Sequence, residues 1–298
     1  MKMNLKKTAA VTFALIAGAA FCADFAPVKN EVKEVHVYQP EHYAVRQGAI
    51  LSNQLCKYEF FLVQSKSNGT NAPRTQLWLQ AGQFGFSPLV GFFKLKVNGI
   101  ELDKLPVNAE DLQPWAEGKN AGAELKLNYD GAKFVLRMYL RPDSPVLWCS
   151  LIPAKDSVEP VQTISAEITA IPSQLLKKNN QVVWNGGYNR MAVTPARTIE
   201  QNPERITLTP QDTMITLQDK DSDGSAAEKG QGPCWVSLNY DAVAKAVLRV
   251  NDDWTSSIYL TLKPDMKEFQ FGFWQQVPRI SNADFAKKLS AEKAAFTR

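Results

Sequence analysis

Apolar and polar residues alternate along most of the chain, which is the pattern of β-strands that bury one face. Residues 57–63 (KYEFFLV), 92–97 (FFKLKV) and 133–140 (KFVLRMYL) are examples. Such runs follow one another along the chain, separated by short segments rich in glycine, proline and asparagine. The further strands that this pattern predicts are 32–38, 76–80, 100–105, 123–128, 146–152, 161–171, 181–184, 191–194, 205–209, 214–218, 234–239, 246–250, 257–262 and 269–274.

Two dipeptides predict tight hairpins within this series. Asn98-Gly99 and Asp130-Gly131 each separate two of the predicted strands. Both central positions of a two-residue hairpin turn need φ > 0, which asparagine, aspartate and glycine adopt most readily. The strands on either side of each dipeptide are therefore expected to pair antiparallel.

Only two segments have a helical pattern. One is short and lies near 108–118, and the other closes the chain over 282–296. Ser281 is placed to cap this second helix, with Asp284 three residues on as in a capping box, and Phe285 begins its apolar stripe. A helix of this length persists in water only when it docks on something, so we expect its apolar stripe to pack on the strands.

Many strands, hairpin turns and few helices predict an all-β protein, a large antiparallel β-sandwich with a C-terminal α-helix. The number of strands exceeds that of a single immunoglobulin-like domain. Two smaller sandwiches joined near 172–180 are the alternative. That segment lacks the Gly, Ser and Pro content of a linker, so one domain over residues 23–298 is preferred.

The first 22 residues have the composition of a signal peptide. Three lysines stand within the first seven residues, an uncharged apolar run covers 8–20, and small residues follow. The run is too short to span a bilayer as a membrane anchor. Cleavage is expected before Ala23 or before Phe21, while the bulky Phe21 argues against lipidation of Cys22. A secreted or periplasmic protein is therefore expected.

The formal net charge of the chain bears on which kinds of molecule it can bind. Removing residues 1–22 lowers the formal net charge from +4 to about +1, because that segment holds three lysines and no acids. The remaining chain has no basic stripe of the kind that binds nucleic acid. It also has no second apolar stretch long enough to cross a membrane.

The cysteines of the chain are Cys22, Cys56, Cys149 and Cys234. Cys149 and Cys234 each lie in a strand-like run beside a tryptophan, where they could form a disulfide or act as small buried apolar residues. The second interpretation is preferred, because a chain of this length can build its core without disulfides.

Residues 133–152 (KFVLRMYLRPDSPVLWCSLI) resemble a recurring hairpin of the galactose-mutarotase-like β-supersandwich proteins. Residues 268–276 (EFQFGFWQQ) are similar to the closing strands of that family. The resemblance implies a supersandwich-like fold. It also implies one of the roles found in the family, which includes sugar epimerases and non-catalytic domains of polysaccharide lyases and glycosidases.

Catalytic signatures are weak throughout. The epimerases of that family use two histidines and a carboxylate, whereas the only histidines here are His36 and His42, outside the segments that carry the resemblance. The spacing of these two residues matches no arrangement that fixes both on one face. No nucleophile elbow, P-loop or zinc-protease motif is present, so no catalytic residue is assigned.

One acidic run resembles a calcium loop. Asp219, Asp221, Asp223 and Gly224 match the opening D-x-D-x-D-G, in which alternate carboxylates converge on a hard cation. The match ends at position 12, where Gly230 replaces the usual bidentate glutamate. Calcium at the three aspartates is one hypothesis, and a solvated hairpin tip is the other.

A second loop combines the groups that saccharide sites use. Trp184, Asn185, Tyr188 and Arg190 stand within seven residues around two glycines, and Trp254 follows two aspartates in a later loop. Aromatic rings cover the C–H face of a pyranose, while amides and arginine bind hydroxyls or a carboxylate. The alternative is that these tryptophans pack in the sandwich core.

The preferred hypothesis is a non-catalytic carbohydrate-interacting protein that binds a saccharide at the 184–190 loop. An enzyme of the same fold, an epimerase, lyase or glycosidase, is the second hypothesis, favoured if His36 or His42 faces one cleft with an acid. A structural or protein-interaction component of the cell envelope is the third, favoured by a flat surface poor in aromatics.

Overall fold

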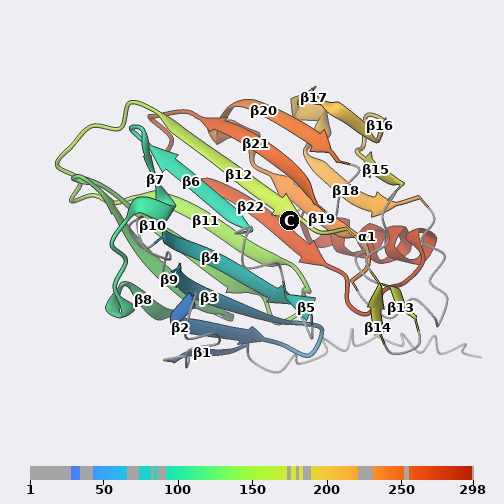
Figure 1. The fold of residues 1–298 in the computed structure, drawn as a ribbon, viewed down its shortest axis with the longest axis horizontal. Helices are drawn as coiled ribbons and strands as arrows, with labels where there is room; N and C mark the ends of the chain where they lie inside the picture. Colours follow the sequence, from blue (N-terminus) through green and yellow to red (C-terminus); the bar gives the residue numbers. More distant parts are fainter. Residues whose placement is uncertain are drawn as a thin grey trace, which may run out of the picture.

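A computed structural model describes residues 28–33, 43–65, 74–81, 84–85, 92–172, 176–178, 181–183, 189–220, 231–251 and 255–296 (Figure 1). The described chain is mostly β-strand, every strand pair is antiparallel, and α1 (Asn282–Phe296) is its one α-helix. The strands are β1 (Lys29–Lys33), β2 (Tyr43–Ser52), β3 (Lys57–Ser65), β4 (Arg74–Ala81), β5 (Phe84–Gly85), β6 (Phe93–Val97), β7 (Ile100–Glu101), β8 (Leu112–Glu117), β9 (Asn120–Tyr129), β10 (Ala132–Leu140), β11 (Leu147–Pro153), β12 (Ile164–Ala170), β13 (Leu176–Lys178), β14 (Gln181–Val183), β15 (Arg190–Val193), β16 (Thr198–Glu200), β17 (Asn202–Leu208), β18 (Met214–Asp219), β19 (Cys234–Leu238), β20 (Val243–Val250), β21 (Ser256–Leu262) and β22 (Phe269–Gln275). The all-β prediction is confirmed.

Two large layers form the sandwich. One is a nine-stranded sheet in the order β16-β15-β18-β19-β22-β11-β10-β9-β8. The other is a six-stranded sheet in the order β17-β20-β21-β12-β6-β7. The five-stranded sheet β1 to β5 lies beside β6 and continues the second layer (Figure 1). A backbone hydrogen bond of 3.2 Å from Phe92 N–H to the Leu77 carbonyl ties β4 to the start of β6.

Buried and less buried side chains alternate along each strand, which explains why the two layers stack. In β10, Phe134, Leu136 and Met138 are at most 1% exposed, while the residues between them are half-buried on the other face. Aromatic rings from both layers then meet in the core. Phe93 of β6 stacks on Phe271 of β22 with ring centroids 5.3 Å apart. The single core between the sheets is thus built from one face of each strand.

The two predicted hairpins are confirmed. Asn98 and Gly99 have φ of 49° and 86° between β6 and β7, and Asp130 and Gly131 have φ of 51° and 97° between β9 and β10. Asn98 also accepts hydrogen bonds at Oδ1 from the Gln162 and Thr163 N–H groups, so this turn is anchored to the segment that leads into β12.

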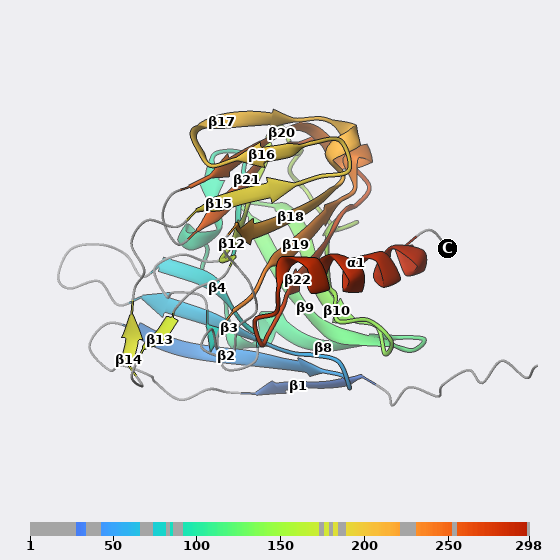
Figure 2. The same ribbon diagram turned by 90° about the vertical axis from the view of Figure 1, so that its right-hand side faces the viewer.

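Helix α1 packs on the outer face of the nine-stranded sheet (Figure 2). The predicted cap is present, because Asp284 N–H donates to the Ser281 hydroxyl at 3.1 Å. Phe285 is fully buried, and its ring centroid lies 4.9 Å from that of Trp274 in β22. Leu289 joins the same cluster. The sheet therefore supplies the docking surface that the apolar stripe required.

The helical pattern near 108–118 does not form an α-helix. Residues 109–111 make one 3-10 turn, and the chain continues as β8, which pairs with β9. Trp115 of β8 contacts Tyr139 of β10, with ring centroids 5.3 Å apart. The edge of the nine-stranded sheet thus offers both backbone partners and a ring contact, which outweigh a weak local helical preference.

Cys56, Cys149 and Cys234 are free thiols, and Cys149 and Cys234 are fully buried, as the preferred interpretation expects. Burial raises the pKa of Cys234 to about 12, and burial followed by the charge of Glu292 does the same for Cys56. Burial also raises the pKa of Cys149 well above its usual value.

We expect these three thiols to resist iodoacetamide at pH 8 in the folded protein, because only the thiolate reacts and its population falls on the order of a thousandfold for a pKa near 12. Peptide mapping after alkylation, with and without urea, measures this. Labelling in urea alone is the expected result, and equal labelling of the native protein would contradict the burial.

The expected leader, residues 1–22, lies outside the described residues, and its assignment and the single domain over 23–298 stay predictions. Within the described ranges, no helix is both long and apolar enough to cross a membrane.

Candidate functional site

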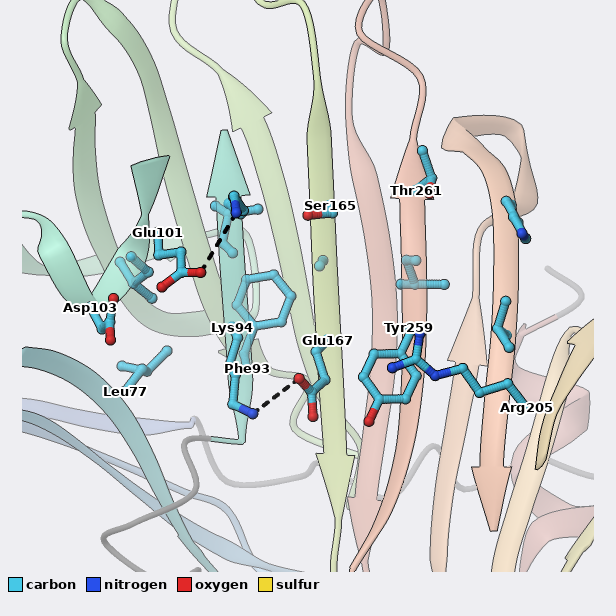
Figure 3. Close-up of a pocket in the computed structure, with 17 residues that line it drawn as sticks. Leu77, Phe93, Lys94, Glu101, Asp103, Ser165, Glu167, Arg205, Tyr259 and Thr261 are labelled. Carbon is cyan, nitrogen blue, oxygen red and sulfur yellow. Dashed lines mark hydrogen bonds and ion pairs between the residues drawn. The ribbon is translucent and has the colours of Figure 1, made fainter. Parts of the chain in front are cut away.

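The outer face of the six-stranded sheet carries a groove of about 650 Å³ (Figure 3). Side chains from β6, β12, β21, β20 and β17 line it, with the 3-10 turn at Leu102–Lys104 at one side. The strands place these side chains in rows, because residues opposite one another in neighbouring strands point to the same face.

The first row crosses four strands. Lys96 of β6 is opposite Ser165 of β12, Ser165 is opposite Thr261 of β21, and Thr261 is opposite Lys245 of β20. All four side chains are exposed. The row therefore presents two hydroxyls between two ammonium groups.

A parallel row lies two residues along each strand. Lys94 is opposite Glu167, and Glu167 is opposite Tyr259. Val247 of β20 follows Tyr259 in the same row. Carboxylate, ammonium and aromatic ring thus stand side by side (Figure 3).

Glu167 is fixed by three donors. Lys94 Nζ lies 3.0 Å from its Oε2, while the hydroxyls of Ser257 and Thr169 donate to its Oε1 at 3.1 and 3.3 Å. Ser257 and Thr169 are buried and lie opposite one another two residues further along β21 and β12, so they hold the carboxylate from beside the groove. This network fixes Glu167 and Lys94 in one arrangement.

Arg205 of β17 completes a flat wall. Its guanidinium carbon lies 4.4 Å from the centroid of the Tyr259 ring. The side chain reaches this ring across β20, the strand between β17 and β21. Stacking of this kind holds the guanidinium plane against the ring and leaves its edge N–H groups available to a ligand.

Arg190 and Asp219 are the predicted site residues that the structure describes, and it brings them together. They are opposite one another in β15 and β18, and Arg190 Nη1 lies 3.7 Å from Asp219 Oδ2. Arg190 is fully buried. The prediction that it binds a ligand stays a prediction, and neither residue lines the groove.

The other predicted site residues lie outside the described ranges. They are Trp184, Asn185, Tyr188, Trp254, Asp221 and Asp223, together with His36 and His42. In the part of the chain that the structure describes, no three His, Cys, Asp or Glu side chains come close enough to hold a metal ion. Because Asp221 and Asp223 are outside those ranges, calcium at the three aspartates stays a hypothesis.

No local motif in the sequence indicates the groove. Its side chains come from strands that are widely spaced in the sequence, and only the register places them in rows. One signal could have found it, namely polar residues at 165 and 167 and again at 259 and 261, each alternating with buried apolar residues. Such alternation identifies an outward face, but not which strands lie side by side.

No protein-family model and no curated protein matches the chain. Among solved structures it is similar to the α-N-acetylgalactosaminidase NagBb from Bifidobacterium bifidum in complex with GalNAc, with 7% identity and a TM-score of 0.48, over 92% of this chain and 39% of that one. It is also similar to an α-galactosidase from Lactobacillus brevis, with 10% identity and a TM-score of 0.42, over 81% of this chain and 40% of that one. A third is the GH36 α-galactosidase AgaB from Geobacillus stearothermophilus, with 9% identity and a TM-score of 0.41, over 83% of this chain and 41% of that one. The chain thus spans about two-fifths of the length of each of these proteins.

Proposed function

We propose that the protein binds a saccharide in the groove of the six-stranded sheet and that it acts by binding rather than by catalysis. The observation that carries the proposal is the flat wall of Tyr259 and Arg205 beside the fixed carboxylate of Glu167. A pyranose has an apolar C–H face and a rim of hydroxyls, so it fits a flat ring next to convergent polar groups. Ser165 and Thr261 add exposed hydroxyls along the floor.

The contacts of Glu167 support binding over catalysis. Glycoside hydrolysis requires one carboxyl group that gives up a proton and a second that attacks or activates water. Both oxygens of Glu167 already accept hydrogen bonds, from Lys94 at one and from Ser257 and Thr169 at the other. Another carboxylate of the groove, Glu101, lies 3.6 Å from Lys96. Held in this way, these acids orient ammonium groups toward a ligand.

The test is a glycan-array screen of the chain without residues 1–22, followed by calorimetry on the best ligand. Tyr259→Ala should weaken binding by about 30-fold, since loss of a central aromatic contact costs about 2 kcal/mol. Tyr259→Phe is the matched control, because it keeps the ring against Arg205 and should bind within a few-fold of wild type.

Each outcome decides one part of the proposal. Absence of binding to every saccharide overturns it, and turnover of a bound saccharide would favour an enzyme of the same fold. Binding that survives Tyr259→Ala would move the site to the 184–190 loop. Trp184→Ala, with and without EDTA, then tests that loop together with calcium at Asp219, Asp221 and Asp223.

Export of the protein is part of the proposal, supported by the charged head and apolar run of residues 1–22. Expression of the full chain in a bacterial host, followed by fractionation and N-terminal sequencing, tests it. Material that stays in the cytoplasm with its first residues intact would contradict export.

A further inference from the structure

We infer that the saccharide bound in the groove is anionic, carrying a carboxylate or a sulfate ester, and that Lys245 and Arg205 bind this group. The inference rests on the proposed function and adds the class of ligand to it. It follows from how the charges of the groove are distributed between its two sides.

On the side of β6 and β7, each lysine has an acidic partner. Lys94 Nζ lies 3.0 Å from Glu167, and Lys96 Nζ lies 3.6 Å from Glu101. The acidic residues that line the groove are Glu101, Asp103 and Glu167, all on β7, the following turn or β12. With two lysines and three carboxylates, this side carries a formal net charge of −1.

On the side of β20 and β17, the cations have no such partner. Lys245 and Arg205 line the groove, and among the residues that the structure describes neither lies within ion-pair distance of a carboxylate. The guanidinium of Arg205 stacks on the ring of Tyr259. Two like charges on one wall repel each other, and an anion bound there relieves that repulsion.

A β-bulge at the start of β20 keeps Lys245 on this wall. In a regular strand, Val243 and Lys245 would point to the same face. The register shifts between them, so Val243 packs in the core with 7% exposure while Lys245 stays opposite Thr261 on the outer face. Bulges of this kind redirect a side chain, here an ammonium group into the groove.

The groove is long enough to hold more of a saccharide than its anionic group. Lys96 and Lys245 stand at the ends of a row of four strands, about 14 Å apart by strand spacing, with Ser165 and Thr261 between them. The hydroxyls can bind sugar hydroxyls, while a planar guanidinium binds a carboxylate or sulfate through two N–H groups. An oligosaccharide with its anionic group toward β20 can bind the two hydroxyls and the guanidinium at the same time.

The test compares oligosaccharides that differ only in charge. Tetragalacturonate is paired with its neutral methyl ester, and a sulfated carrageenan tetrasaccharide is paired with its desulfated form, by calorimetry at 50 and 300 mM NaCl. In one of the two pairs, the charged oligosaccharide should bind at least tenfold tighter than its neutral counterpart at 50 mM NaCl, and this ratio of affinities should fall at 300 mM NaCl. A preference in the galacturonate pair indicates a carboxylate ligand, and a preference in the carrageenan pair indicates a sulfate ester.

Lys245→Met should reduce that preference to about twofold or less, and Lys245→Glu should reverse it. Lys155→Met is the matched control, because Lys155 is exposed outside the groove, and it should keep the preference. Melting temperatures verify that each variant is folded.

Failure of the inference differs from failure of the proposed function. If neutral and acidic members bind equally and Tyr259→Ala abolishes both, saccharide binding in the groove stands and the anionic ligand is refuted. If nothing binds, both are refuted. If the Lys245→Met, Arg205→Met double variant still prefers the charged oligosaccharide, these two residues do not bind its anionic group.

Discussion

Replacing Phe285 by alanine is expected to lower the free energy of unfolding by about 3–5 kcal/mol. The ring is fully buried between α1 and the nine-stranded sheet, against Trp274 and in one cluster with Trp235 and Leu289. Its loss leaves a cavity and removes the main contact that holds a helix too short to persist alone. Urea denaturation followed by tryptophan fluorescence measures the change, because Trp274 and Trp235 lie beneath the helix.

The control is Lys287→Ala in the same helix. The Lys287 side chain is 79% exposed and pairs with Asp284 along the helix surface, so its loss should change stability by less than about 0.5 kcal/mol. Equal stability of Phe285→Ala and wild type, with unchanged fluorescence, would show that the helix does not hold to the sheet through this ring.

Arg190→Met is expected to lower the free energy of unfolding by about 3–5 kcal/mol. Arg190 is fully buried, and the side chain of its partner Asp219 is only 12% exposed, so the variant removes the cation of a buried ion pair. Thermal and urea unfolding measure the loss. In the Arg190→Met, Asp219→Asn double variant, most of the loss should be recovered, because the uncompensated charge is gone.

An exposed pair nearby provides the contrast. Lys220 pairs with Glu200 at the surface, and Lys220→Met should cost at most about 1 kcal/mol. The same variants separate two roles of Arg190. Loss of stability with unchanged saccharide affinity identifies a structural ion pair. Loss of affinity at unchanged stability would instead place the ligand at the 184–190 loop.

The all-β fold class, the two tight hairpins and the C-terminal helix could be predicted, because each depends on local rules. Alternation at period two, φ > 0 at Asn98-Gly99 and Asp130-Gly131, and the Ser281 cap all act within a few residues. The segment 108–118 shows the limit of such rules. Its local pattern predicts a helix, whereas the structure has strand β8 there, which pairs with β9 and places Trp115 against Tyr139 of β10.

The candidate site could not be predicted in the same way. Sequence reasoning selected loops in which suitable residue types stand close together in the chain, such as 184–190 and the three aspartates. The sequence pattern assigns Arg190 and Asp219 to two separate candidate sites, whereas the register of β15 and β18 makes them an ion pair. A pairing between strands depends on register, which a single sequence constrains only through its pattern of buried faces.

The sequence by itself determined that this chain makes antiparallel strands with one apolar face, where its tight turns fall and where its helix begins, because these follow from steric and hydrogen-bonding preferences of neighbouring residues. Only the tertiary structure decided which outer face α1 covers and which stays open. It also placed Lys245, Tyr259 and Glu167 on one surface although β12 and β20 are far apart in the chain. The physical reason is that burial of apolar faces selects the strand order, and the strand order then sets which outward polar side chains become neighbours.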